Sequence, residues 1–418
     1  MSHLEDLANR LDRALAGADA ALAASYPGDR GVRQPVHTVY VPGDRYDEKT
    51  VAEWSAESGR VLAEHGGSAA EVADSFDLEP GLADEIYDRV TAKLAAEPIE
   101  DLRIDFEDGY GARPDEDEDA AVVAAARALA ATVRDGSATP FHGIRLKSFE
   151  APTRHRGLRT LDLFLGELVR EGGLGAGFVI TLPKVTSVEQ VTAMVTALDA
   201  LEAVHGIGAE SLRFEIQVET PQAILGSDGT ALIARMIAAG AGRVTGLHYG
   251  TYDYSASLGV AAAFQSMEHP VADHAKDVMQ VAAAGTGVFV SDGSTNVLPV
   301  GDPDAVRAAW RLHSRLVSRS LARGIYQGWD LHPAQLPSRY IATYAFFRDG
   351  LEVAFARLRA YVHGGDSSYL DEPATAAALA AFVLRGVECG AVAADEVETL
   401  AGIDRAKLAE LARRRITA

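Results

Sequence analysis

Residues 177–220 read GFVITLPKVTSVEQVTAMVTALDALEAVHGIGAESLRFEIQVET, and this stretch decides the fold. It begins with a β-rich run at 177–184, continues with a helical pattern rich in Ala and Leu, and ends with a second β-rich run at 212–220. A strand, a helix and a strand in this order are typical of a unit whose two strands lie parallel in one sheet.

The same alternation extends in both directions along the chain. Six further β-rich runs, with helical patterns between most of them, occur at 37–41, 102–108, 142–148, 243–250, 286–292 and 324–333. Eight parallel strands joined by right-handed crossovers can close into a barrel. An open, doubly wound sheet is the alternative, but no glycine-rich nucleotide-binding motif follows an early strand. We therefore predict an α/β fold of the (β/α)8 TIM barrel type.

The two ends of the chain lack this alternation. Residues 1–30 predict an N-terminal helix, because apolar residues recur there at helical spacing, at Leu4, Leu7, Leu11 and Leu15. Residues 349–418 contain no strand-like run and predict a helical extension. Residues 31–348 are then the barrel, which we expect to be the catalytic domain.

The charge of the chain excludes several classes of function. It has 60 acidic and 39 basic residues, a net charge of −21, which disfavours binding to nucleic acid or to an anionic membrane. The N-terminus lacks the features of a signal peptide and no apolar stretch is long enough to span a bilayer, so we expect a cytoplasmic protein. The single cysteine, Cys389, excludes a disulfide framework and a thiolate metal cage.

Polar side chains gather at the carboxyl ends of the predicted strands, where the active sites of barrels form. They include several carboxylates, whose oxygens suit Mg²⁺ or Mn²⁺ better than zinc. Glu219 ends one strand and Asp253 follows the next, so both are candidate metal ligands at the rim. Arg145 ends an earlier strand, and its guanidinium can bind a substrate carboxylate, pair with Glu107 or Asp108, or do both.

Seven runs, in order along residues 37–340, resemble motifs of the citrate lyase β-subunit-like group of the HpcH/HpaI aldolase family. The runs are VYVPGDR (39–45), IDFEDGYG (104–111), GIRLKS (143–148), ITLPKVTSVEQV (180–191), VETPQAI (218–224), GLHYGTYDYSASLG (246–259) and GWDLHPAQL (328–336). The resemblance implies a TIM barrel that uses a divalent metal to make or break a carbon–carbon bond beside a carbonyl group.

Site residues follow from the matching positions. Glu219 and Asp253 correspond to metal ligands, and Arg145 to the residue that binds the acid end of the substrate. The other predicted catalytic residues are Glu107, Asp108, Lys147, Asp292 and His332. Gly250, Thr251 and Tyr252, in the loop before Asp253, are predicted to contact substrate. Lys147 departs from the family, because it stands where the family's "RIN" run has Asn.

The residues and the resemblance together predict a lyase or aldolase dependent on Mg²⁺ or Mn²⁺. It would act on a small 2-oxo or hydroxy carboxylic acid through a metal-stabilised enolate. The base is left open among a metal-bound hydroxide, Asp292, His332 and a residue of the tail. His332 has a second interpretation, in which its imidazole only caps a loop. The resemblance also implies a homo-oligomer, a trimer or a hexamer.

Two alternatives remain from the sequence. The first is an acyl-CoA lyase or thioesterase of the malyl-CoA or citryl-CoA type, which needs cations for the CoA phosphates. The clustered candidates are Arg45, Lys147, Arg154 and Arg156. The second is a metal-binding subunit without catalytic activity that serves in an assembly.

Overall fold

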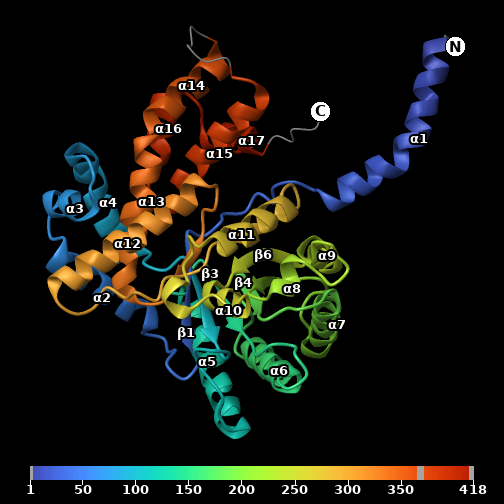
Figure 1. Ribbon diagram of the computed structural model, residues 1–418, viewed down its shortest axis with the longest axis horizontal. Coiled ribbons are helices and arrows are strands. Elements are labelled where there is room, and N and C mark those ends of the chain that lie inside the picture. Colours follow the sequence, from blue (N-terminus) through green and yellow to red (C-terminus); the bar gives the residue numbers. More distant parts are fainter. Residues whose placement is uncertain (1–2, 365–370, 414–418) are drawn as a thin grey trace.

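Eight parallel strands form a barrel at the centre of the molecule (Figure 1). They are β1 (His37–Pro42), β2 (Asp101–Asp105), β3 (Phe141–Arg145), β4 (Phe178–Leu182), β5 (Phe214–Val218), β6 (Val244–Tyr249), β7 (Phe289–Ser291) and β8 (Gly328–Asp330). The computed structural model describes residues 3–364 and 371–413. Neighbouring strands follow the order β7-β6-β5-β4-β3-β2-β1-β8, and a parallel bridge between Ser291 and Gln327 joins the two ends. The predicted (β/α)8 barrel is confirmed.

Helices follow the strands and cover the outside of the barrel. The principal ones are α5 (Asp115–Asp135), α6 (Arg154–Arg170), α7 (Val188–His205), α9 (Leu232–Ala239), α11 (Pro270–Ala283), α12 (Pro303–Ala322) and α13 (Leu336–Asp349). The long spacer between β1 and β2 forms α2 (Thr50–His65), α3 (Ala69–Phe76) and α4 (Pro80–Ala96). Two short helices, α8 (Pro221–Ile224) and α10 (Thr251–Ser257), begin directly after β5 and β6, at the carboxyl end of the barrel.

The sequence of α7 shows why these helices begin and end where they do. Ser187 and Gln190 form a capping box that satisfies backbone N–H groups at its start. Gly206 ends it in the left-handed conformation with φ of 68°, which glycine adopts without steric cost. Buried Val191, Met194 and Leu198 recur at helical spacing, so one face of α7 packs on the barrel.

The inside of the barrel is polar as well as packed. Arg103 of β2 donates to Thr181 of β4 and to Glu215 of β5, at 3.2 and 2.9 Å. Since neither β4 nor β5 is a neighbour of β2 in the sheet, these bonds cross the barrel interior. Alternate residues of a strand point to the same side, so Asp105 and Gln217 also face the interior, nearer the carboxyl end.

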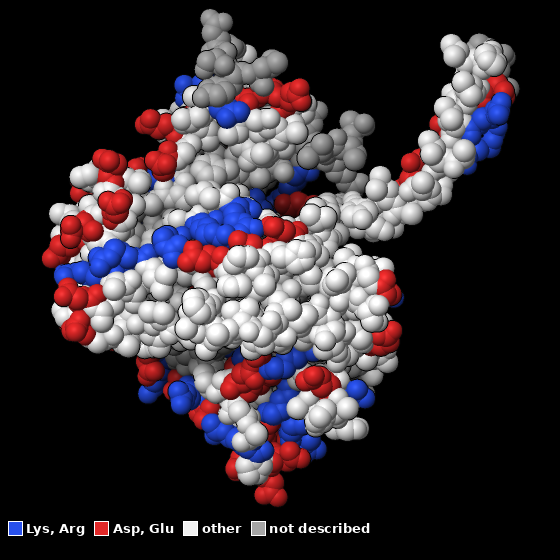
Figure 2. Space-filling view, in the orientation of Figure 1, with Lys and Arg blue, Asp and Glu red and all other residues white. Residues whose placement is uncertain are grey.

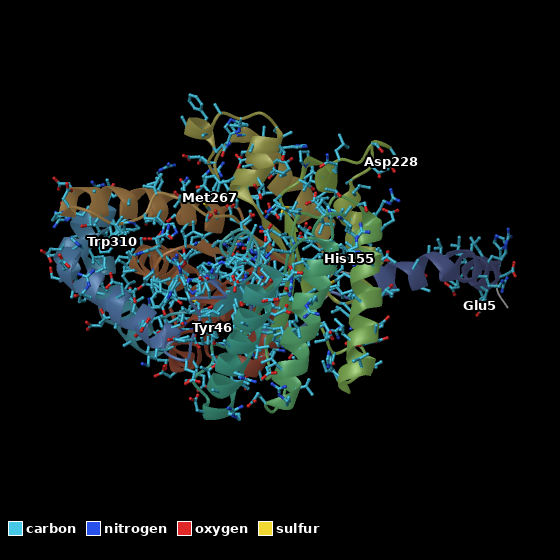
Figure 3. The ribbon with its side chains drawn as sticks, turned by 90° about the horizontal axis from the view of Figure 1, so that it is seen from below. Glu5, Tyr46, His155, Asp228, Met267 and Trp310 are labelled. Carbon is cyan, nitrogen blue, oxygen red and sulfur yellow. The ribbon has the colours of Figure 1, made fainter. Side chains whose placement is uncertain are left out.

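The ends of the chain are helical. The N-terminal helix α1 (His3–Ser25) has no buried residue and extends away from the barrel in both views, with Glu5 near its far end (Figures 1 and 3). The last helices are α14 (Leu351–His363), α15 (Pro373–Cys389), α16 (Ala394–Ala401) and α17 (Arg405–Ala412). They pack beside α13, where the rings of Phe347 and Phe382 are in contact in a tilted arrangement, with centroids 5.2 Å apart. Domain boundaries at residues 30 and 348 stay predictions.

Charged side chains gather along part of the face that Figure 2 shows. Basic side chains form a band on that face, flanked by acidic ones. Along α12, Arg315 pairs with Glu268 at 2.6 Å and Arg319 with Asp273 at 2.5 Å. Within the described ranges, no helix is both long and apolar enough to cross a membrane.

Candidate functional site

Arg145 lies at the carboxyl end of β3 and is held by Asp105 of β2. Its Nε and Nη2 atoms donate to the two carboxylate oxygens of Asp105 at 2.7 and 2.6 Å, and Nη1 donates to Gln217 at 3.2 Å. The guanidinium also lies over the ring of Tyr40, 4.5 Å from its centroid. Three of the five N–H groups of an arginine are thereby engaged, and two are left for a ligand. The partner predicted for Arg145 was Glu107 or Asp108; Glu107 is farther away, at 3.6 Å.

Lys184, just after β4, stands at the centre of an acidic cluster. Its ammonium group contacts Glu107, lies 2.7 Å from Asp108 and 3.4 Å from Asp253. Burial by itself would lower the pKa of Lys184, but the facing carboxylates of Glu107 and Glu219 outweigh burial and raise the pKa above its ordinary value. The structure therefore brings together carboxylates from the ends of β2, β5 and β6 around one cation.

The backbone of Lys184 takes part as well. Its φ is 51°, in the left-handed region that residues with a side chain rarely adopt. In this conformation its N–H donates to Glu219 Oε1 at 2.8 Å. Strained backbone of this kind persists where the surrounding structure enforces it, and it is concentrated at functional sites.

Glu219 is the most buried carboxylate of the cluster, with 2% of its surface exposed. Its second oxygen accepts from Gln217 Nε2 at 2.5 Å. Burial raises the pKa of Glu219 to about 8, with Glu107 and Asp253 adding to the effect and Lys184 and Arg145 opposing it. A Cβ at position 250 would lie 2.5 Å from the Cβ of Glu219, so only glycine fits beside this carboxylate.

Helix α10, which begins directly after β6, places Asp253 at the rim, where 45% of its side chain is exposed. The neighbouring predicted contact residues have partners within the protein. Thr251 donates to the carbonyl of Ser294 at 3.3 Å, and the hydroxyl of Tyr252 accepts from the backbone N–H of Asn296 at 2.6 Å. These contacts tie α10, which carries Asp253, to the segment that follows β7.

Three predicted catalytic residues make their contacts outside this cluster. Lys147 donates to Glu118 at 2.7 Å, and Asp292 accepts from Lys276 at 2.9 Å and from a serine hydroxyl. His332 accepts from the backbone N–H of Ala334 at 3.1 Å, which is its loop-capping interpretation. Burial lowers the pKa of His332 and so favours its neutral imidazole.

Lys184, Asp105 and Gln217 belong to the site although they were not predicted as site residues. Asp105 and Gln217 stand on strands that are followed by a predicted residue, and Lys184 lies within the run 180–191 that resembles a family motif. The signal was therefore present in the sequence. What the sequence did not contain was the convergence of the Lys184 ammonium and three carboxylates.

The residues of the cluster fit a divalent metal by their chemistry. Glu219 and Asp253 offer the hard oxygen donors that Mg²⁺ prefers, and Mg²⁺ needs only one or two carboxylates in addition to water and substrate oxygens. The Lys184 ammonium marks a place that already holds a cation. Within residues 3–364 and 371–413, no group of three or more His, Cys, Asp or Glu side chains is arranged to hold a metal.

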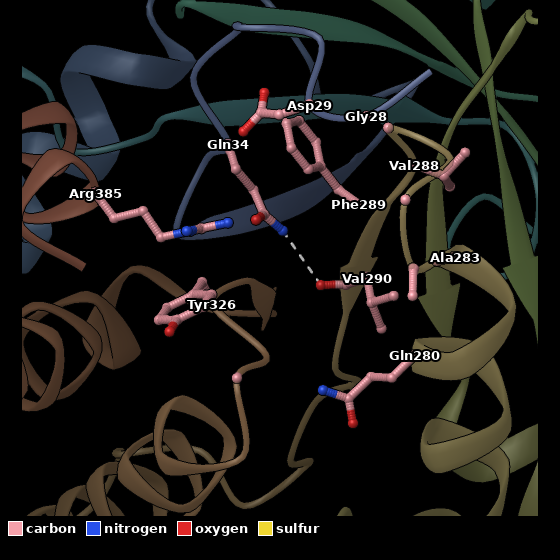
Figure 4. Close-up of a pocket in the computed structure, with 14 residues that line it drawn as sticks. Gly28, Asp29, Gln34, Gln280, Ala283, Val288, Phe289, Val290, Tyr326 and Arg385 are labelled. Carbon is pink, nitrogen blue, oxygen red and sulfur yellow. Dashed lines mark hydrogen bonds between the residues drawn. The ribbon is translucent and has the colours of Figure 1, made fainter. Parts of the chain in front are cut away.

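A separate pocket lies at the opposite, amino end of the barrel (Figure 4). Its lining includes Gly28, Gln34, Val288 and Arg385, and Gln34 Nε2 donates to the carbonyl of Val290 at 3.2 Å. Because the active sites of TIM barrels form at the carboxyl end, this pocket is not the candidate site.

Comparison with protein families gives a match over nearly the whole chain. A family described as a domain of unknown function (DUF6986) matches residues 15–416. The chain belongs to this family. Comparison with curated proteins gives no match.

The fold of this chain is similar to that of a solved citrate lyase. A citrate lyase from Burkholderia xenovorans LB400 aligns with a TM-score of 0.57 and 17% identity, over 89% of this chain and 99% of that one. A Haloferax volcanii malate synthase in a magnesium/glyoxylate complex aligns with a TM-score of 0.47 and 16% identity, over 93% and 99% of the two chains. At this identity the likeness concerns the fold, and for the fold the predicted resemblance to citrate lyase is confirmed.

Proposed function

We propose that the protein is a lyase or aldolase, dependent on Mg²⁺ or Mn²⁺, that acts on a small 2-oxo or hydroxy carboxylic acid. The observation that carries this proposal is the convergence of Glu107, Asp108 and Asp253 on one cation, with Glu219 and Arg145 beside them. An excess of carboxylates at the carboxyl end of the barrel attracts a divalent cation, and the guanidinium supplies a fixed site for an acid group.

Glu219 and Asp253 would hold the metal. When bound, the metal supplies positive charge that stabilises negative charge developing on a carbonyl oxygen. Arg145 would use its two remaining N–H groups to bind and orient the substrate carboxylate. Asp105 keeps the guanidinium in place through two parallel hydrogen bonds, so little reorganisation is needed when substrate arrives.

Glu107 is the side chain of the cluster best suited to hold a proton. It is buried, with 8% of its surface exposed, and burial raises its pKa. Asp292 and His332, the bases considered from the sequence, are engaged with Lys276 and with the Ala334 backbone. In this proposal Glu107 takes the proton from the substrate.

The proposal can be tested without knowing the complete substrate. The full-length protein is incubated with pyruvate and Mg²⁺ in D₂O, and loss of the methyl proton signal is followed by NMR. An enzyme that forms an enolate exchanges these protons. We expect exchange that requires Mg²⁺ or Mn²⁺ and that falls about a hundredfold or more in Glu219→Gln.

Lys147→Met is the matched control, because Lys147 lies at the same end of the barrel but pairs with Glu118 outside the cluster. Its exchange rate should equal that of the wild type. Undiminished exchange in EDTA, or in Glu219→Gln, would contradict the proposal. If pyruvate is inert, glyoxylate condensation with acetyl-CoA and cleavage of 2-hydroxy acids are the next assays.

We propose a free acid rather than a CoA thioester, because two of the four cations considered for CoA phosphates already have carboxylate partners. Of the four cations considered for CoA phosphates, Lys147 pairs with Glu118 and Arg156 with Asp119, at 2.7 and 2.6 Å. Phosphate binding would have to compete with these carboxylates. A thermal-shift comparison of CoA thioesters with free acids separates the two classes. Light scattering in the same buffers measures whether the chain forms the proposed homo-oligomer, a trimer or a hexamer.

A further inference from the structure

We propose that Lys184 is an internal counter-ion of the metal site, which a divalent ion must displace before it can bind. This inference rests on the proposed function, because it concerns the same carboxylates. Its consequence is that Lys184 couples the binding of the metal to the binding of an anionic acid.

The first argument is the position of the ammonium. It contacts Glu107, Asp108 and Asp253, and the proposed ligand Asp253 is 3.4 Å from Nζ. A divalent ion held by Asp253 and Glu219 would therefore come within a few ångströms of the ammonium. Two cations at such a distance repel strongly in a partly buried site. The carboxylates can hold the ammonium or the divalent ion, but not both in the present arrangement.

The second argument is that the backbone and the side chain of Lys184 have different freedom. The backbone N–H is fixed on Glu219 Oε1 at 2.8 Å, in a left-handed conformation. The side chain has four rotatable bonds and is 23% exposed, so its ammonium can move toward solvent without disturbing that hydrogen bond. Displacement of the ammonium leaves Glu219 in place to bind the metal.

The third argument is the cost of leaving the cluster unpaired. Without a cation, Glu107, Asp108, Asp253 and Glu219 would repel one another, and Glu219 and Glu107 are buried. Lys184 reduces this repulsion while no metal is bound. An ammonium displaced to the mouth of the barrel can then pair with the negatively charged group of the incoming acid. Metal and acid should therefore bind cooperatively.

The test measures metal affinity directly and does not depend on turnover. Binding of Mn²⁺ to the full-length protein is followed by EPR, through loss of the signal of free Mn²⁺, with and without oxalate. The variant is Lys184→Met, which keeps the apolar stem and removes the charge. Lys184→Arg keeps the charge, and Lys147→Met removes a charge outside the cluster. Circular dichroism establishes that each variant is folded.

We expect Lys184→Met to bind Mn²⁺ about tenfold or more tightly than the wild type in the absence of oxalate, since the metal no longer competes with the ammonium. Oxalate should improve Mn²⁺ affinity about tenfold in the wild type and much less in Lys184→Met. Lys184→Arg and Lys147→Met should stay within about twofold of the wild type, because each leaves a cation in the cluster.

Equal or weaker Mn²⁺ binding by Lys184→Met would overturn the inference. The proposed function is judged by a different variant in the same assay. If the wild type and Lys184→Met bind Mn²⁺ equally well and Glu219→Gln does not bind it, the metal site stands and the role of Lys184 is wrong. If Glu219→Gln binds Mn²⁺ as the wild type does, the proposed metal site itself is wrong.

Discussion

Asp330 and Glu219 are two carboxylates of the same barrel, equally buried, whose pKa values shift in opposite directions. Asp330, at the end of β8, is 0% exposed and Glu219 is 2% exposed. Burial alone would raise the pKa of both carboxylates. At Asp330 the guanidinium of Arg339 and the imidazoles of His313 and His37 outweigh burial and hold the pKa well below its ordinary value. At Glu219 burial prevails and the pKa rises to about 8.

The difference lies in what surrounds each carboxylate. Asp330 accepts from Arg339 at 2.9 Å, from His37 at 2.7 Å, and lies 3.1 Å from His313. Glu219 accepts two neutral hydrogen bonds and faces two further carboxylates, Glu107 and Asp253. A carboxylate whose charge is fully compensated serves the fold, whereas one left among like charges is available for a cation. Titratable groups whose environments shift their pKa values in opposite directions are a mark of functional sites.

The largest effect on stability should come from removing the main counter-charge of Asp330. Arg339→Met leaves Asp330 buried without its main counter-charge, so we expect the free energy of unfolding to fall by about 3–5 kcal/mol. Urea denaturation followed by circular dichroism measures this. The lost stability should be greatest at neutral pH and smaller in acid, because a carboxylate with a lowered pKa stabilises only above its unfolded pKa.

Arg315→Met is the matched control for this experiment, since Arg315 pairs with Glu268 at the surface, where 54% of the arginine side chain is exposed. Arg315→Met should change the free energy of unfolding by no more than about 1 kcal/mol. A loss in Arg339→Met no larger than that of the control would show that Asp330 is not structurally important.

The second change, Glu219→Gln, should stabilise the protein instead of destabilising it. Ionised Glu219 is unfavourable in the fold, because its folded pKa of about 8 lies above the ordinary value of 4.5. The penalty is absent near pH 4.5 and grows as the pH rises toward 8. Glu219→Gln removes it, so we expect the variant to be about 1–3 kcal/mol more stable than the wild type at pH 8 in metal-free buffer.

Thermal unfolding at pH 8 and at pH 5 checks this prediction, and the gain should be clearly smaller at pH 5. A variant that is destabilised at both pH values would mean that Glu219 is compensated in the metal-free protein, as Asp330 is. The contrast between the two carboxylates would then be lost.

The third and smallest effect concerns the metal. Mg²⁺ that binds only the folded protein should add about 1.4 kcal/mol to stability at a concentration ten times its dissociation constant. The rise in melting temperature should disappear in Asp253→Asn, whose own stability without metal should match the wild type because Asp253 is half exposed. An identical rise in Asp253→Asn would place the metal elsewhere. EDTA should reverse the rise in the wild type.

The polar residues at the strand ends predicted much of the candidate site, but they did not predict which of these residues join the cluster and which have other partners. Glu107, Asp108, Arg145, Glu219 and Asp253 were predicted and lie together. Lys147, Asp292 and His332 occupy equivalent positions at strand ends, yet their contacts are with Glu118, Lys276 and the Ala334 backbone. Strand periodicity fixes which end of the barrel a residue occupies, but not the rotamer or the partner that it finds there.

The sequence by itself determined the architecture of this protein, because alternating strand and helix patterns and right-handed crossovers leave few ways to arrange eight parallel strands. It also determined that carboxylates collect at one end. Only the tertiary structure decided which carboxylates are compensated and which are not. That distinction depends on contacts between strands far apart in the chain, such as Lys184 with Glu107, and on how much water each group loses on folding.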